Sequence, residues 1–286
     1  MKLLFILLLS ACSAFADTQT DIEYARVGDL SLKLDLHLPA RPRPPLIVYI
    51  HGGAWRAGSK SDVPIAALHD LGFAMASVDY RLSTQAVFPA QIHDIKAAIR
   101  FLRASAGRFQ IDATSIAIIG SSAGGHLAAL TGVTNGHPAL EGRIGEHLDQ
   151  SSAVQMIVSL YGAANLQTIL DQSTEFGLKM RVPALQLLLD GQPTEKPELA
   201  KLASPVAHLD KDDPPLLLIH GDADPQMPPE QSRELAKAYE AMGLSVKLIT
   251  LPGSRHGGDE FYDSERTAMM AAFLSESLKG RSKVSQ

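Results

Sequence analysis

Cysteine is almost absent from this chain, since Cys12 is the only one in 286 residues. A disulfide framework within the chain is excluded because each bridge needs two thiols. Stability must therefore come from the burial of apolar side chains. Hydrophobic residues make up 45% of the sequence, which is enough for one large core at this length. We expect a single domain.

Clustered positive charge is also missing. Lysine and arginine number 26 against 31 acidic residues, and the formal net charge is −5. No run of five or six basic residues offers an electrostatic footprint for a phosphate backbone, so nucleic acid is not an expected partner. The histidines show no metal-ligand spacing with a supporting carboxylate. We expect neither a metal nor another cofactor.

The long apolar runs of membrane spans are missing too. No segment reaches the roughly 18 apolar residues that a transmembrane helix needs. The N-terminus has Lys2, a short apolar run over 3–9 and the small-residue pattern of 14–16. This layout predicts a secretory signal peptide over 1–16, cleaved before Asp17.

Cys12 supports an alternative interpretation of the same segment. Residues 9–12, Leu-Ser-Ala-Cys, also resemble a bacterial lipoprotein signal over 1–11, in which Cys12 is lipidated and becomes the first residue. About ten residues after Cys12 would then act as a tether. Both interpretations predict export, to the periplasm or the medium in the first case and to the outer membrane in the second.

The hydrophobic pattern predicts an α/β fold. Residues 31–38 alternate between polar and leucine positions, which is typical of a half-buried antiparallel strand. Continuous apolar runs typical of buried parallel strands occur at 46–50, 73–78, 116–119, 154–160, 216–219 and 246–251. Predicted helices alternate with them at 89–103, 123–130, 230–242 and 267–278. Such alternation favours a mostly parallel sheet covered by helices on both faces.

One stretch does not fit this alternation. About forty residues over 162–204 contain three prolines, only weak helical patterns and an apolar cluster at 185–189. We interpret this stretch as a small cap inserted between two core strands. Phe176, Leu178, Met180 and the cluster 185–189 are candidate contacts for a substrate, or equally the packing of the cap against the core.

The strongest motif is Gly-Ser-Ser-Ala-Gly at 120–124, directly after a buried strand and before a helix. A G-x-S-x-G sequence in this setting predicts a nucleophile elbow, in which glycines let the strand and the helix approach closely. Ser122 stands at the apex, at a helix N-terminus that favours developing negative charge. Ser122 is therefore the predicted nucleophile, ahead of Ser121.

A serine nucleophile needs a base, and the base needs an orienting carboxylate. With this elbow the chain order is serine, acid, histidine. Asp222 and Asp224 both follow the strand 216–219, and we assign Asp224 as the acid and Asp222 to bracing the turn. His256, in a glycine-flanked loop after the last strand, is the predicted base.

Acyl transfer also needs backbone donors for an oxyanion. The amide of Ala123 is one candidate, and Gly52 and Gly53 after the strand 46–50 are the others. The alternative is an ordinary Gly-Gly turn. We expect the His51 side chain to anchor this loop and His126 to pack beneath the elbow.

Together these motifs resemble the α/β-hydrolase group that includes bacterial feruloyl and acetylxylan esterases and, more distantly, hormone-sensitive-lipase-like carboxylesterases. The resemblance covers most of 17–286 and is carried by His51 to Lys60, Asp79 to Leu82, Phe88 to Gln91, Gly120 to His126, Asp213 to Pro215 and His220 to Asp224. It implies one catalytic domain with an eight-stranded, mostly parallel sheet and a short cap, and it gives Ser122, Asp224 and His256 the same roles. Two positions depart from the group, Ala54 for a glycine and Met227 for a small aliphatic residue.

Several functions remain open at this point. The resemblance and the export signal favour an exported serine esterase acting on acetyl or feruloyl esters of plant polysaccharide. A general short-chain carboxylesterase and a kynurenine-formamidase-like amide hydrolase use similar residues. A catalytically inactive binding protein on the same fold is the non-enzyme alternative. The sequence leaves the substrate-binding residues unknown.

Overall fold

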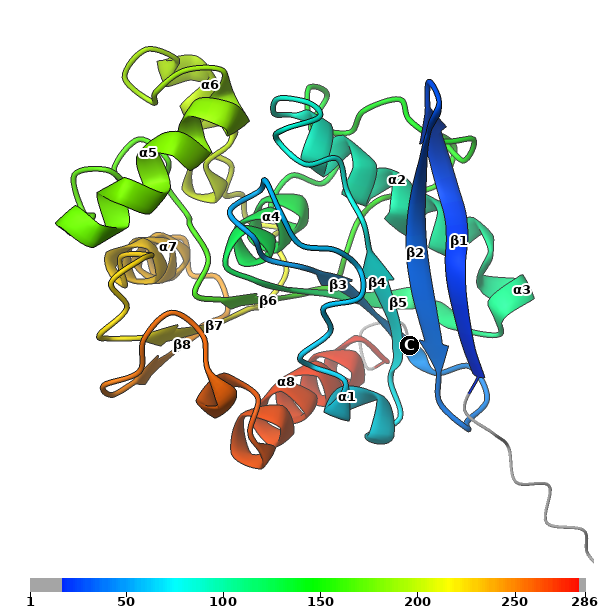
Figure 1. Ribbon diagram of the computed structural model, residues 1–286. Helices are drawn as coiled ribbons and strands as arrows, with labels where there is room; N and C mark the ends of the chain where they lie inside the picture. Colours follow the sequence, from blue (N-terminus) through cyan, green and yellow to red (C-terminus); the bar gives the residue numbers. More distant parts are fainter. Residues whose placement is uncertain (1–16, 283–286) are drawn as a thin grey trace, which may run out of the picture.

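The computed structural model describes residues 17–282, with side chains described up to residue 276. Its centre is one eight-stranded sheet in the order β1-β2-β4-β3-β5-β6-β7-β8 (Figure 1). The strands are β1 (Asp17–Val27), β2 (Leu30–Leu38), β3 (Pro45–Ile50), β4 (Ala74–Val78), β5 (Asp112–Ser121), β6 (Met156–Leu160), β7 (Leu216–Gly221) and β8 (Val246–Leu251). The predicted α/β-hydrolase architecture is confirmed.

Strand directions follow the two hydrophobic patterns. β2 buries Leu32, Leu34 and Leu36 and pairs antiparallel with both β1 and β4. From β3 to β8 every adjacent pair is parallel. Strands with continuous apolar sequences lie between two helical layers because both of their faces must be covered.

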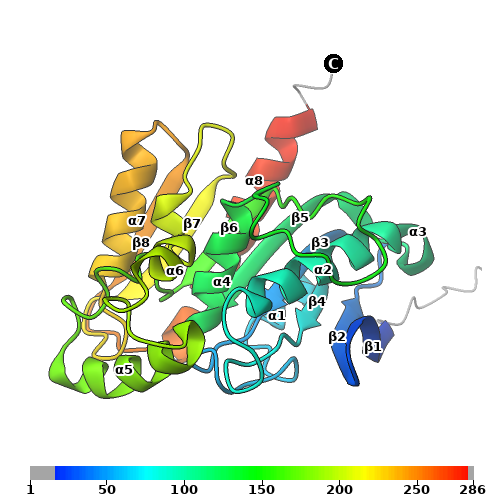
Figure 2. The same ribbon diagram turned by 90° about the horizontal axis from the view of Figure 1, so that it is seen from above.

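The helices divide into two layers (Figures 1 and 2). One face of the sheet packs against α2 (Ala90–Ala104), α4 (Ala123–Gly132) and α7 (Glu230–Ala241), and the other against α1 (Ala67–Asp70) and α8 (Ser264–Ser282). The short α3 (Ala106–Phe109) follows α2, and single 3₁₀ turns occupy Pro205–Ala207 and Asp259–Phe261. The apolar side chains accordingly form two core clusters, one on each side of the sheet.

The inserted segment contains α5 (Glu175–Leu189) and α6 (Pro197–Leu202), which lie over α4 and α7 in Figure 1. Thr174 caps α5 by accepting a hydrogen bond from the amide of Gly177 at 3.0 Å. The expectation of only weak helices here was wrong, since α5 runs for 15 residues in spite of Pro183. Tertiary packing of one buried face outweighs the poor local helix pattern.

The tether expected after Cys12 is also wrong, because β1 begins at Asp17 and pairs with β2 along its length. The two signal-sequence alternatives, including lipidation of Cys12, concern residues 1–16 and lie outside the described residues. Within 17–282, no helix combines the length and apolar character required to cross a membrane.

Candidate active site

The nucleophile elbow joins β5 to α4. Ser122 has φ of 54° and ψ of −117°, a conformation that few non-glycine residues adopt. A Cβ on Gly120 would lie 2.1 Å from the carbonyl oxygen of Gly124, and one on Gly124 would lie 2.0 Å from that of Ile50. Both positions therefore require glycine, and this close approach holds the strained Ser122 at the carboxyl end of the sheet.

Ser122, His256 and Asp224 come together although they are far apart in the sequence. Ser122 Oγ lies 2.8 Å from His256 Nε2, and His256 Nδ1 lies 2.6 Å from Asp224 Oδ2. These residues follow β5, β8 and β7 respectively. The order nucleophile, base, acid and both distances are those of a serine-hydrolase triad.

Asp224 is held as a charged carboxylate. Burial alone would raise its pKa, but hydrogen bonds from His220 and His256 hold the pKa of Asp224 well below its usual range. Its Oδ1 also accepts hydrogen bonds from the amides of Gln226 at 2.8 Å and Met227 at 2.9 Å. The carboxylate is thus oriented on both oxygens and keeps the charge needed to stabilise an imidazolium.

The two competing residues have other partners. Asp222 Oδ1 accepts a hydrogen bond from the amide of Gly253 at 2.7 Å and so joins the β7 and β8 loops. The hydroxyl of Ser121 lies 3.0 Å from that of Tyr49, behind the elbow. Neither side chain makes a hydrogen bond to His256 in the described part of the chain.

Of the three predicted oxyanion donors, Gly52 and Gly53 line the same pocket as Ser122, while Ala123 is the first residue of α4, directly after Ser122. Gly52 and Gly53 follow β3, and Gly53 has φ of 105°. Ala54 and Trp55 also have positive φ, 52° and 60°, although neither is glycine. Because such backbone costs about 1 kcal/mol or more per residue, the loop stores strain beside the nucleophile.

Buried aromatic contacts hold this loop in place. The ring of His51 stacks on that of Tyr80 with centroids 4.4 Å apart, and the Tyr80 hydroxyl donates to the carbonyl of His51 at 3.1 Å. Trp55 Nε1 donates to His126 Nδ1 at 3.1 Å, while His126 Nε2 lies 2.6 Å from the carbonyl oxygen of Ala203. His126 therefore carries its proton on Nε2. It connects the loop 51–58, which we call the oxyanion loop, to the end of the cap segment 162–204.

The catalytic pocket has a volume of about 410 Å³. Of the candidate cap contacts only Met180 lines it, while Phe176 is 51% exposed and Leu185, Leu188 and Leu189 are buried in the core. The interpretation of the apolar cluster as packing is the one that the structure supports. The complete lining is Gly52, Gly53, Ala54, Arg56, Ala57, Asp62, Ser121, Ser122, Tyr161, Met180, Arg181, Gln226 and His256.

Sequence reasoning gave no role to several of these residues, and Tyr161 and Arg181 are the two with the most distinctive positions. Tyr161 follows β6 directly, with φ of 41°, and its ring meets that of His256 edge-on at 4.9 Å. Arg181 lies on the buried face of α5 and is 1% exposed. The position at a strand end could have indicated Tyr161, and a lone cation among the buried positions of α5 could have indicated Arg181.

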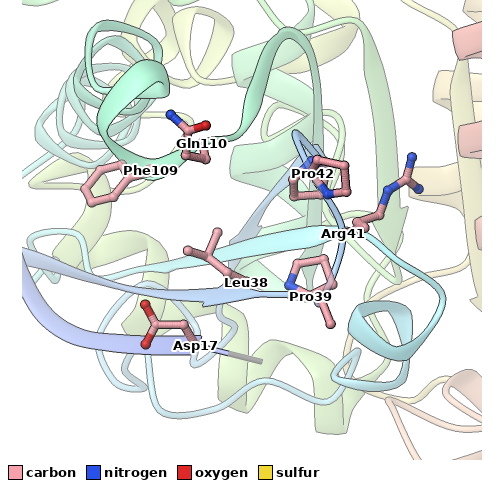
Figure 3. A pocket seen from close by; sticks show the side chains of 9 residues that line it. Asp17, Leu38, Pro39, Arg41, Pro42, Phe109 and Gln110 are labelled. Atoms are coloured by element: carbon pink, nitrogen blue, oxygen red, sulfur yellow. The ribbon is translucent and has the colours of Figure 1, made fainter. Parts of the chain in front are cut away.

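A second hollow, of about 300 Å³, lies at the other end of the sheet (Figure 3). Its walls include Leu38, Pro39 and Arg41 on one side and Phe109 and Gln110 on the other. These residues stand near the amino ends of β3 and β5, whereas α/β sheets bind their ligands at the carboxyl ends. No histidine or serine lines this hollow, so the catalytic chemistry belongs to the first pocket.

The family model BD-FAE matches residues 34–239, which include the elbow, the oxyanion loop and the acid. The chain belongs to the BD-FAE family. Among solved structures, a truncated carbohydrate esterase from gut microbiota is 34% identical with a TM-score of 0.84, and the alignment covers 93% of this chain and 98% of that one. The esterase Est2 of Thermogutta terrifontis with bound propionate is 27% identical with a TM-score of 0.73, covering 91% and 94%.

Curated relatives of this BD-FAE chain carry similar names. Esterase LipC of Mycobacterium tuberculosis is 33% identical over 85% of this chain and 61% of its own length. Esterase LipQ of the same organism is 31% identical over 92% of this chain and 62% of its own length. The chain thus spans about three fifths of these relatives.

Proposed function

We propose that this protein is a serine esterase that hydrolyses carboxylic esters through an acyl-enzyme. The observation that carries the proposal is the continuous chain of contacts from Ser122 through His256 to Asp224 beside a glycine loop. The esterase names of the relatives and structural neighbours support it.

The reaction follows from the geometry. Ser122 Oγ attacks the ester carbonyl carbon while His256 Nε2 takes the hydroxyl proton, and the resulting oxyanion accepts hydrogen bonds from the amides of Ala123 and of Gly52 or Gly53. Collapse of the intermediate breaks the bond to the alcohol, which leaves with the proton from His256. A water molecule then attacks the acyl-enzyme with the same base, releases the acid and restores Ser122.

We further propose that the substrates are short or aromatic acyl esters on plant polysaccharide, acetyl or feruloyl. A carbohydrate esterase among the structural neighbours supports this substrate class. The second candidate is a general short-chain carboxylesterase, which is favoured by the propionate- and butyrate-bound structures of Est2. An acetyl esterase and a short-chain carboxylesterase both require a small acyl pocket, whereas a feruloyl esterase requires one that accepts an aromatic acyl group.

The test is kcat/KM on aryl esters from acetyl to decanoyl, on methyl ferulate and on acetylated xylan. Each methylene beyond the capacity of a small pocket should cost about 1 to 3 kcal/mol, so activity should fall steeply with acyl length. Turnover of xylan acetate or methyl ferulate favours the polysaccharide esterase, and turnover of short aryl esters alone favours the general carboxylesterase. A maximum at eight carbons or more, with no turnover of xylan acetate or methyl ferulate, would contradict both.

Export forms a separate part of the proposal. The apolar run 3–9 and the residues 9–16 support translocation, with either cleavage before Asp17 or a lipid anchor at Cys12. The intact mass of the protein isolated from its host distinguishes a lipidated Cys12 from an N-terminus at Asp17. An N-terminus at Met1 would overturn export by either route.

A further inference from the structure

Arg181 combines three features that its role in packing does not explain. It lies on α5, lines the catalytic pocket and is 1% exposed. Its guanidinium makes one hydrogen bond to another described residue, from Nε to the carbonyl oxygen of Gln226 at 3.3 Å, and Nη1 has no partner. No carboxylate of residues 17–276 lies within ion-pair distance of it.

Such an arrangement is costly. Removing a guanidinium from water without a paired carboxylate loses solvation that one long hydrogen bond does not restore. Burial lowers the pKa of Arg181 to about 10, yet the side chain stays cationic at neutral pH. The Arg181 Cζ atom lies 6.0 Å from the centroid of the Trp55 ring, and this cation–π contact does not neutralise the charge.

The position of Arg181 relative to the triad is well defined. The hydroxyl of Thr174, at the start of α5, donates to the carbonyl of Pro225 at 2.8 Å. A Cβ on Gly177 would lie 3.0 Å from the same carbonyl oxygen, so α5 packs directly on the loop that follows Asp224. These contacts hold the first turn of α5 against the loop that follows Asp224, and the Arg181 Nε donates to Gln226 of the same loop.

A second cation lies in the same pocket. Arg56, in the oxyanion loop, is partly buried and forms no ion pair with a described carboxylate. The acidic side chain in the lining is Asp62, which is exposed and not in ion-pair contact with either arginine. Asp224 is already engaged by two histidines. The pocket thus has an excess of positive charge and unused donors.

We propose that Arg181, assisted by Arg56, binds a carboxylate of the substrate, so that the enzyme prefers esters carrying a negative charge near the scissile bond. A uronic acid in an acidic polysaccharide has this chemistry. Guanidinium donors pair with carboxylates through parallel hydrogen bonds, and the substrate would supply the partner that the fold leaves out. This inference rests on the proposed esterase function and narrows its substrates.

The test uses two pairs of rigid, nearly isosteric esters in which a carboxylate is replaced by a neutral carboxamide. Monomethyl terephthalate against methyl 4-carbamoylbenzoate places the carboxylate in the acyl half, and 4-acetoxybenzoate against 4-acetoxybenzamide places it in the alcohol half. For each pair the ratio of kcat/KM, charged over neutral, is measured for the wild type and for Arg181→Gln. Dividing one ratio by the other cancels the intrinsic reactivities.

In at least one pair the ratio should fall by about 10- to 100-fold in Arg181→Gln, the range of a charge-assisted hydrogen bond. Arg181→Lys should retain part of the preference, and Arg56→Gln should lower it to a smaller extent. Lys179→Gln is the matched control, because Lys179 carries the same charge on the exposed side of α5. Its ratios should equal those of the wild type.

Thermal unfolding separates this role from a structural one. A buried cation held only for packing would lower the melting temperature when replaced and leave both ratios unchanged. If both ratios are the same in the wild type, Arg181→Gln, Arg181→Lys and Arg56→Gln, the carboxylate site is overturned. Turnover of the neutral esters in that case would still support the esterase function. Absence of turnover on every ester would instead overturn the proposed function.

Discussion

Two aspartates in one loop illustrate how the site depends on single contacts. Asp224 and Asp222 both follow β7, but one receives His256 and the other receives the amide of Gly253. Glycine neighbours and loop position were sufficient to single out Ser122, Asp224 and His256 in the sequence, and the structure brings these three side chains into contact. The positions of Tyr161 and Arg181 were not predicted, because they depend on how a helix and a strand end pack in three dimensions.

Replacement of each aspartate by alanine should separate their roles. Asp224→Ala leaves His256 without its orienting carboxylate, so kcat should fall by about 10⁴-fold. Asp222→Ala removes a loop contact and should keep most of the activity. Steady-state kinetics on a short aryl ester measures both, with circular dichroism as the control for folding. Equal losses in folded variants would leave the acid unassigned.

His126 should make the protein sensitive to acid. Burial lowers its pKa to about 4, whereas a histidine in the unfolded chain takes up a proton near pH 6.5. Because the folded state binds fewer protons between these values, this group's contribution is fully present above about pH 6.5 and is lost as the pH falls to about 4. The loss should amount to about 3 kcal/mol.

Denaturant unfolding at pH 7 and pH 4.5 tests this prediction. His126→Asn should lower the stability at pH 7 and reduce the difference between the two pH values. His147→Asn, at a partly buried histidine, is the control and should preserve the wild-type difference. If the stability of His126→Asn changes between pH 7 and pH 4.5 as much as that of the wild type, groups other than His126 cause the acid sensitivity.

At the scale of elements, the hydrophobic pattern predicted best those strands that are buried on both faces of the sheet. The runs that became β3 to β7 are apolar because helices cover both faces of the sheet, whereas β8 lies at an edge and is only partly buried. β1 was missed because it forms an edge and its sequence is largely polar and exposed. The helical character of α5 was underestimated from the sequence. Its stability comes from contacts of one face with the core and with the loop that follows Asp224, rather than from local helix propensity.

The ion pair between Arg81 and Asp94 joins the segment after β4 to α2. Arg81 Nη2 lies 2.7 Å from Asp94 Oδ1, and the carboxylate side chain is fully buried. Arg81→Met leaves that buried charge without its partner and should reduce the free energy of unfolding by about 3 to 5 kcal/mol. Chemical denaturation at pH 7 measures the change.

The exposed pair Arg26 and Glu23 provides the comparison, since both side chains are largely in solvent. Arg26→Met should change the stability by less than about 1 kcal/mol. Similar effects for the two arginine substitutions would show that burial does not govern the strength of these pairs.

At the scale of the whole molecule, one sheet carries the entire proposed chemistry. The proposed nucleophile, acid and base follow β5, β7 and β8. These strands are parallel, so their carboxyl ends lie at the same end of the sheet. Within the described residues, no group of three histidine, cysteine, aspartate or glutamate side chains is placed to hold a metal ion. The triad supplies the nucleophile and the proton transfer by itself.

Because the proposed mechanism uses the hydroxyl of Ser122 as nucleophile and His256 as base, a chelator should leave catalysis unchanged. We expect kcat/KM on a short aryl ester to be the same before and after dialysis against EDTA, and a serine-directed organophosphate to abolish it. Activity that disappears in EDTA and returns with added metal would contradict the proposed mechanism.

The distance along the chain between Ser122 and His256 has a consequence during synthesis. The two residues are 134 positions apart, and the strand that positions His256 is the last of the sheet. At about 5 to 20 residues per second, a ribosome needs roughly 7 to 27 s to add the base after the nucleophile. Throughout that interval the nascent chain presents a serine without a proton acceptor. The proposed hydrolysis of esters therefore cannot begin until His256 has been added and its loop has folded.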